Sequence, residues 1–193
     1  YDLCRPTYCQ NKEMWRQVLI ASGAVIAEND TWLNDAFARY KQLLDPSFKG
    51  GVISSDGCIP SEVNRDTALE YSTFAMKAMI SLCEIARHNG TDLYYHRNSN
   101  GTSIETALDK YASFCSATDP AQEWRNNCNC KDQFGNSQCT ESSQLDSNEA
   151  SLYEVAYNWK QKVMYENVVR RWGRPMYENR VIGQVTLTHG RLF

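Results

Sequence analysis

The residues from Ala68 to about Arg87 are apolar on almost every side of the helix that their pattern predicts. The polar residues recur at steps of three and four and form one narrow stripe: Glu70, Thr73, Lys77, Ser81, Glu84 and His88. A helix with so little polar surface must be surrounded by other elements on most of its circumference. We therefore predict an all-α protein organised around this central helix.

Thr67 and Glu70 have the spacing of a capping box, which would begin the central helix at Ala68 and leave Arg65 in the loop before it. Arg65 and Tyr71 can then face one ligand. The alternative is that Arg65 pairs with a neighbouring carboxylate and that Tyr71 is a core residue with its hydroxyl satisfied.

Periodicity predicts further helices on both sides of the central one. Asp45-Pro46 should end one of them, Thr102 or Ser103 should cap another, and Gly90 should end the central helix. Val181 to Leu187 is expected to be an extended tail. We predict about five helices in all. Besides the central helix, they are Lys12–Glu28, Trp32–Leu44, Ile104–Phe114 and Glu149–Gln161, and a short helical piece follows at Met164–Arg171.

Residues 117–148 are rich in Asn, Gln, Ser, Asp and Cys and have no apolar period. We interpret them as a disulfide-stapled loop insert that holds Cys128, Cys130 and Cys139. A zinc site is the alternative, but the usual paired cysteine spacing is missing. Near the start of the chain, Cys4 and Cys9 could pair with each other or staple this end elsewhere.

The 193 residues suit a single domain, 1–193, that can bury a core without help. A net charge of −3 argues against a nucleic-acid partner. The sequence contains no run of about 18 apolar residues, the length that a membrane-spanning helix would need. Three glycosylation sequons begin at Asn29, Asn89 and Asn100. Together with the eight cysteines, they indicate a secreted, extracellular glycoprotein with disulfide bonds.

Three motifs, in order, carry a resemblance to a known family. They are Asn11-Lys12 followed by Trp15, the segment DGCIPSEVNRDTALEYSTFAMKAM from Asp56, and RVIGQVTL from Arg180. This arrangement resembles the alginate lyase family, polysaccharide lyases with an incomplete α/α toroid of helical hairpins. The resemblance implies that fold here. With about five helices, we expect the chain to be the C-terminal part of a longer precursor, so that an N-terminal segment is missing from it, or to act as a homo-oligomer.

The resemblance also implies β-elimination of an acidic, uronate-containing polysaccharide such as alginate or glucuronan, with no cofactor and no metal. Tyr71 would transfer the proton, and Asn11 and Arg65 would stabilise the sugar carboxylate. Lys12 stands where the family has a His. Its ammonium can neutralise a carboxylate but is a poor base at neutral pH, which favours chemistry through Tyr71.

Other residues are candidates for sugar contacts. Trp15 follows the Asn-Lys pair, and the stretch Tyr95, His96 and Arg97 could line a sugar groove through stacking and carboxylate contacts. For Lys12 the alternative is a plain position in the first turn of a surface helix. For the whole chain it is a non-catalytic glycan-binding or structural glycoprotein on the same scaffold.

Overall fold

The computed structural model describes residues 11–49, 51–178 and 183–190. Within these ranges the protein is all-α, as predicted; there are nine helices, no strand, and two isolated bridges, Thr67 with Glu141 and Glu178 with Gly183. The helices are α1 (Asn11–Ile26), α2 (Asp30–Leu44), α3 (Ala68–His88), α4 (Ile104–Ser116), α5 (Pro120–Asn127), α6 (Ser147–Ala150), α7 (Leu152–Trp159), α8 (Val163–Trp172) and α9 (Val185–His189). Among these described helices, none combines the length and apolar character that a membrane span requires.

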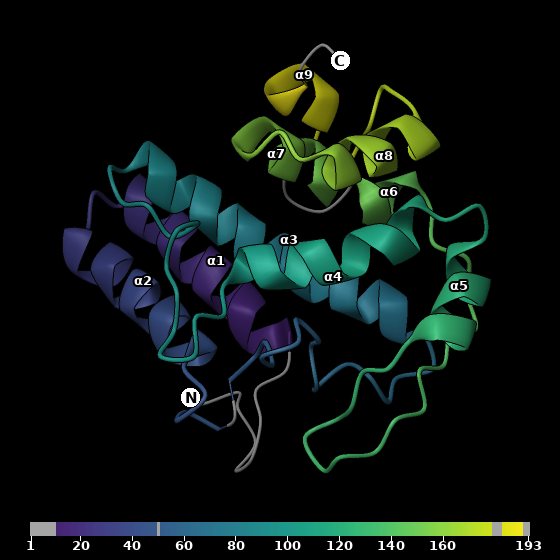
Figure 1. The fold of residues 1–193 in the computed structure, drawn as a ribbon. Coiled ribbons are helices and arrows are strands. Elements are labelled where there is room, and N and C mark those ends of the chain that lie inside the picture. The colour runs from purple at the N-terminus through teal and green to yellow at the C-terminus, as the bar shows by residue number, and fades with distance from the viewer. Residues whose placement is uncertain (1–10, 50, 179–182, 191–193) are drawn as a thin grey trace.

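Helix α3 is the centre of the packing (Figure 1). It contacts α1 and α2 on one side, and α4, α6 and α7 elsewhere along its length. Even its polar stripe is covered in the middle, since Thr73, Lys77 and Ser81 are buried. The Lys77 ammonium lies 3.5 Å from the Glu178 carboxylate and 3.8 Å from that of Glu149, so the buried cation is matched by carboxylates from the C-terminal part.

The C-terminal helices α6 to α9 form a second group that lies beside α3 and α4 (Figure 1). Helix α8 packs against α4 and α7, and α7 packs against α9. Apolar residues of α4, α7 and α8 fill the space between them, among them Leu108, Tyr153 and Tyr165. A single hydrophobic core therefore runs from α1 to α9.

Several helix ends fall where the sequence predicts them. Helix α2 ends at Leu44, directly before Asp45-Pro46, and α4 begins after Ser103, which forms a capping box with Thr106. Gly90 follows α3 at φ 75°, the left-handed conformation expected of it.

The predicted capping box of α3 is wrong. The helix begins at Ala68 as expected, but the Thr67 side chain makes no capping hydrogen bond. The backbone N–H groups of Leu69 and Glu70 donate instead to Glu141 Oε2, at 2.8 and 3.2 Å. An acceptor from the insert, remote in sequence, has replaced the local one.

Three other expectations need correction. The insert 117–148 contains helix α5, whose Asp119 side chain caps its first turn and whose Pro120 occupies the first helical position. The single helix predicted over Glu149–Gln161 is two helices, α6 and α7, that meet at Ser151. The predicted extended tail is helical from Val185 onward; Val181 and Ile182 lie outside the described residues.

Among the described residues, four cysteines form two disulfides, Cys58–Cys130 and Cys128–Cys139. All three insert cysteines are thus oxidised, which removes the zinc alternative and confirms the stapled insert. Cys83 and Cys115 are buried thiols, and Cys4 and Cys9 lie outside the described residues.

Candidate active site

The predicted catalytic residues line one groove. Its volume is 730 Å³, which is in the size range of ligand sites. Its wall is formed by Asn11, Lys12, Trp15, Arg16, Leu19, Arg65, Tyr71 and Phe74. The residues come from the start of α1, the loop before α3 and the first turns of α3. The groove therefore lies where the N-terminal ends of two helices meet a loop.

Glu62 fixes Asn11 at one end of the groove. Glu62 is fully buried, and its Oε1 accepts hydrogen bonds from the backbone N–H and the side-chain Nδ2 of Asn11, at 3.0 and 3.1 Å. The Ser61 hydroxyl donates to the same oxygen at 3.1 Å. These bonds determine which way the amide of Asn11 is turned. An amide nitrogen carries two N–H donors, so one remains beyond the one that Glu62 uses.

Arg65 lies between Glu62 and Tyr71. Its Nη1 is 3.7 Å from Glu62 Oε2, too far for a hydrogen bond, and its guanidinium carbon is 3.8 Å from the centre of the Tyr71 ring. Among the described residues, Glu62 Oε2 is a buried oxygen without a hydrogen-bond partner. The guanidinium is thus oriented by a cation–π contact and a loose ion pair, and about a third of the side chain, 33%, is exposed. Arg65 therefore fits both interpretations: it faces a carboxylate, as the alternative predicts, and it lines a groove together with Tyr71, as a shared ligand site requires.

The insert clamps the loop that carries Arg65. Thr140 Oγ1 donates to the carbonyl of Arg65 at 2.6 Å, and Ser142 N donates to the carbonyl of Asp66 at 2.9 Å. Ala68 N donates to the carbonyl of Thr140, and Glu141 caps the next two residues of α3. Residues 140–142 therefore hold both Arg65 and the helical turn before Tyr71.

The motif loop, residues 56–66 before α3, is held on its other side by α4. A Cβ atom at Gly57, whose φ is +88°, would stand 2.5 Å from the Thr106 carbonyl oxygen, so only glycine fits this contact. The Tyr111 hydroxyl accepts from the Ile59 N–H and contacts the Ser72 hydroxyl at 3.1 Å. The loop that supplies Glu62 and Arg65 is thus fixed between α4 and the insert.

The family model for alginate lyases, described as "Alginate lyase", matches residues 3–124. The chain belongs to the alginate lyase family. The match includes all the residues of the groove, and it ends within α5.

The fold agrees with a solved structure of the family. An alginate lyase from Bacteroides ovatus superimposes with a TM-score of 0.68 at 22% sequence identity. The likeness covers 93% of this chain and 42% of the other, so the chain spans less than half the length of that enzyme. No curated protein matches the chain. The helical scaffold of an alginate lyase, predicted from the three motifs, is confirmed.

Within this family member, Lys12 lies on the rim of the groove. It is exposed, whereas the neighbouring Asn11 is only 5% exposed. Trp15 is half-buried, and its ring lies 4.9 Å from that of Phe74. Lys12 and Trp15 therefore line the same hollow as Arg65 and Tyr71, as the sequence led us to expect.

Tyr95, His96 and Arg97 do not line this groove. His96 and Arg97 border a separate hollow of 450 Å³ beside Lys41 and Asp45, and burial followed by the Lys41 ammonium lowers the pKa of His96 below its usual value. Tyr95 is 61% exposed and meets the edge of the Trp159 ring.

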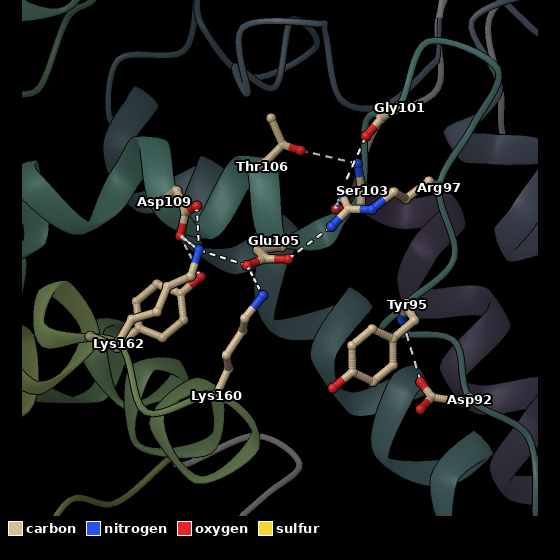
Figure 2. A network of polar contacts seen from close by, with 11 residues as sticks. Asp92, Tyr95, Arg97, Gly101, Ser103, Glu105, Thr106, Asp109, Lys160 and Lys162 are labelled. Carbon is tan, nitrogen blue, oxygen red and sulfur yellow. Dashed lines mark hydrogen bonds and ion pairs between the residues drawn. The ribbon is translucent and has the colours of Figure 1, made fainter.

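Arg97 belongs to a network of ion pairs that joins α4 to the segment between α7 and α8 (Figure 2). Glu105 accepts from Arg97 at 3.1 Å and also pairs with Lys160 and Lys162, while Lys162 pairs with Asp109 at 2.6 Å. The two lysines, by hydrogen bonds, hold the pKa of Glu105 down to about 2 against the effect of burial. This network ties loops to helices, and we assign it a structural role.

Besides the apolar wall residues Leu19 and Phe74, two charged residues of the site were not predicted from the sequence. Glu62 is the Glu of the motif Asp56-Gly57-x-x-Pro60-x-Glu62, but no local sequence pattern indicated that it would bind Asn11, 51 residues away. Arg16 is one helical turn after Lys12 on α1, and that spacing was its signal.

The sequon asparagines lie at helix ends or in a loop, away from the groove. Asn29 caps α2 by accepting from Trp32 N, Asn89 is the residue after α3, and Asn100 is exposed in the loop before α4. Within the described ranges, no group of His, Cys, Asp and Glu could hold a metal ion. The absence of a metal or cofactor from the reaction stays a prediction.

Proposed function

We propose that this protein cleaves an acidic, uronate-containing polysaccharide by β-elimination. The observation that carries the proposal is that Asn11, Lys12, Arg65 and Tyr71 line one groove. Membership of the alginate lyase family supports the same chemistry. Alginate and glucuronan are the substrates we expect, and the disulfides and sequons support a secreted enzyme.

The proton on C5 of a uronate is weakly acidic because its removal places charge on the adjoining carboxylate. Donors aimed at that carboxylate stabilise the developing charge. The remaining N–H of the Asn11 amide and the guanidinium of Arg65 would fill this role, with the Lys12 ammonium as a further cation at the rim. Glu62 would be a positioning residue, because it orients Asn11 and faces Arg65 without reaching the groove wall itself.

Tyr71 would then carry the proton. As a phenolate, Tyr71 takes the proton from C5 and becomes the neutral phenol, the electron pair of the C–H bond forms the C4–C5 double bond, and the bond from C4 to the glycosidic oxygen breaks. The leaving oxygen receives a proton, which Tyr71 can return when both atoms lie on its side of the ring. Trp15 offers an aromatic surface in the same groove for the sugar ring. Tyr95, His96 and Arg97 are outside the groove wall, so the proposed substrate contacts do not include them.

The test is the ultraviolet absorbance of the unsaturated uronate formed from a panel of polymers: polymannuronate, polyguluronate, glucuronan and a neutral glucan. Tyr71→Phe should lower turnover by about 10²- to 10⁴-fold, the usual contribution of acid–base catalysis. The matched control is Tyr95→Phe, which also removes one exposed phenolic hydroxyl but lies outside the groove. Equal turnover in the two variants would remove Tyr71 from the mechanism. Binding of a uronate polymer without any unsaturated product would identify a non-catalytic glycan-binding protein instead.

A further inference from the structure

A second hollow adjoins the candidate active site. It has a volume of 600 Å³ and lies between α1 and α2, lined from α1 by Arg16, Gln17, Leu19, Ile20 and Gly23 and from α2 by Trp32, Asp35, Ala36 and Arg39. Arg16 and Leu19 also line the groove that holds Tyr71. The two hollows are therefore neighbours that share a wall.

The wall that connects the two hollows is one stripe of α1, with Arg16 and Leu19 at its centre. Lys12, Arg16, Leu19 and Gly23 recur at steps of three and four and so lie on one face of the helix. At about 1.5 Å per residue, the stripe is about 16 Å long. A chain of sugars bound at Tyr71 could follow this stripe into the second hollow.

The side chains of the second hollow suit a uronate. Trp32 is 55% exposed, which is unusual for so large an apolar side chain, and Leu19 is 73% exposed. Aromatic faces of this kind pack against the apolar face of a sugar ring. Arg16 and Arg39 line the same hollow, and guanidinium groups can donate to a carboxylate.

The two arginines are held in place from beneath. Glu13 is fully buried, and its Oε1 accepts from Arg39 Nε at 3.1 Å, from Arg16 Nη1 at 3.3 Å and from Gln17 Nε2 at 2.9 Å. The Arg39 guanidinium also lies 4.7 Å from the centre of the Phe48 ring. Glu13 thus orients both guanidinium groups as Glu62 orients Arg65.

The charge of the combined wall is opposite in sign to that of the whole protein. Lys12, Arg16, Arg39 and Arg65 line the two hollows, where Asp35 is the one carboxylate among the wall residues. The buried Glu13 and Glu62 reduce the excess to one positive charge, in a chain whose formal net charge is −3. An anionic chain is therefore attracted to this face and repelled by much of the remaining surface.

We propose that the hollow between α1 and α2 is a binding subsite for uronate residues of the polymer beyond those at Tyr71. Trp32 supplies the sugar platform, and Arg16 and Arg39 bind the carboxylates. This inference rests on the proposed function, since it requires an acidic polysaccharide as the ligand. It adds residues on α2 to a site otherwise built from α1, α3 and the loop between α2 and α3.

Gly23 permits a test that does not endanger the fold. It is helical and exposed, and a Cβ atom there would meet nothing within 4 Å. Gly23→Glu and Gly23→Lys therefore place opposite charges at the far end of the stripe, and both replace a poor helix former with a good one. Trp32→Ala removes the platform, and Phe134→Ala is the matched control, since Phe134 is 66% exposed on the insert.

Affinity for polymannuronate, polyguluronate and glucuronan is measured in the Tyr71→Phe background, so that binding is read without turnover. Trp32→Ala should weaken binding of the polymer by roughly tenfold, as loss of an aromatic contact does, and Phe134→Ala should not change it. Gly23→Glu should weaken and Gly23→Lys strengthen binding by about two- to fivefold at low salt, with both effects fading as salt is added. In the active enzyme, Trp32→Ala should raise KM for the polymer and leave KM for the shortest cleaved oligosaccharide unchanged.

The outcomes separate this inference from the proposed function. If the enzyme cleaves a uronate polymer but none of the three variants changes affinity, the subsite is refuted and the lyase proposal stands. If Trp32→Ala instead changes the oligomeric state and not the glycan affinity, the hollow is a protein interface. If no uronate polymer is bound or cleaved, both proposals fail together.

Discussion

The contact between the insert and α3 allows us to predict how much Glu141 contributes to stability. This side chain is 4% exposed, and its Oε2 accepts from the N–H groups of Leu69 and Glu70. Its Oε1 accepts from the N–H and hydroxyl of Ser143, at 3.2 and 3.0 Å. Glu141→Ala removes the cap of the central helix. Glu141→Gln keeps one oxygen acceptor for the N–H groups of Leu69 and Glu70, but it loses the second acceptor at Ser143 and removes the charge.

The expected loss of stability depends on which backbone N–H groups lose their hydrogen-bond acceptor. In Glu141→Ala the buried N–H of Leu69 is left without an acceptor, whereas the N–H of the half-buried Glu70 can be reached by water. Loss of a cap with one buried donor unsatisfied costs about 2 kcal/mol of the free energy of unfolding. For a chain of this size, that corresponds to a fall in Tm of about 4–8 °C.

Glu141→Gln should cost much less. The charge favours the helix N-terminus by about 0.5–1 kcal/mol, but burial opposes it and raises the pKa of Glu141 above its ordinary value. The two effects largely cancel, so we expect a change in the free energy of unfolding below about 1 kcal/mol.

Urea unfolding followed by circular dichroism at neutral pH measures both variants, and turnover is read on the same samples. Because Arg65 and Tyr71 border the clamped turn, Glu141→Ala should also lower kcat/KM by about tenfold or more, since small displacements of positioned groups are costly. Equal stabilities for Glu141→Ala and the parent protein would refute the view that the insert caps α3.

Three further predictions concern other parts of the structure. Glu62→Gln should lower kcat more than it raises KM, because the amide cannot balance the charge of Arg65, and the far-ultraviolet spectrum should not change; unaltered kinetics would remove Glu62 as a positioning residue. Replacing Cys58 and Cys130 by Ser should cost about 4 kcal/mol in chemical denaturation, since that bond closes a 72-residue loop; a loss below about 1 kcal/mol would contradict the assignment. Burial, followed by a hydrogen bond with Asp146, raises the pKa of Glu149 to about 7, from about 4.3 in the unfolded chain. The protonated carboxyl therefore stabilises the fold below pH 4, and this stabilisation is lost as the pH rises through 7. Glu149→Gln should remove this part of the pH dependence, and identical unfolding profiles of the variant and the parent protein from pH 4 to 8 would exclude the effect.

The long helices could be predicted from the sequence because their signals are local and repeated. The apolar pattern from Ala68 onward covers almost six turns, and the ends of α2 and α4 carry Asp45-Pro46 and Ser103. Asp119-Pro120 offered an equally local signal for α5, but the polar composition of the insert obscured it. Short helices such as α6 and α9 depend on packing, so their sequences alone did not define them.

The site was predictable in its residue types and not in its support. Asn11, Arg65 and Tyr71 were expected in one groove, and the structure places them there. The groups that orient them are distant in sequence: Glu62 is 51 residues from Asn11, and Glu141 is 72 residues from Leu69. Thr67-x-x-Glu70 was a sound local capping pattern, yet a carboxylate delivered by tertiary structure took its place.

Within the described part of the chain, two disulfides and the short backbone segments between them link the loop before α3 to residues 140–142. Cys58 lies in the motif loop and bonds Cys130; Cys128 bonds Cys139, and the next residues, Thr140 to Ser142, grip the backbone from Arg65 to Glu70. These disulfides therefore help to hold residues 140–142 against Arg65 and the start of α3. A newly made chain with all its thiols reduced would contain every groove residue but would lack their alignment. We therefore expect it not to cleave polysaccharides until it reaches an oxidising environment.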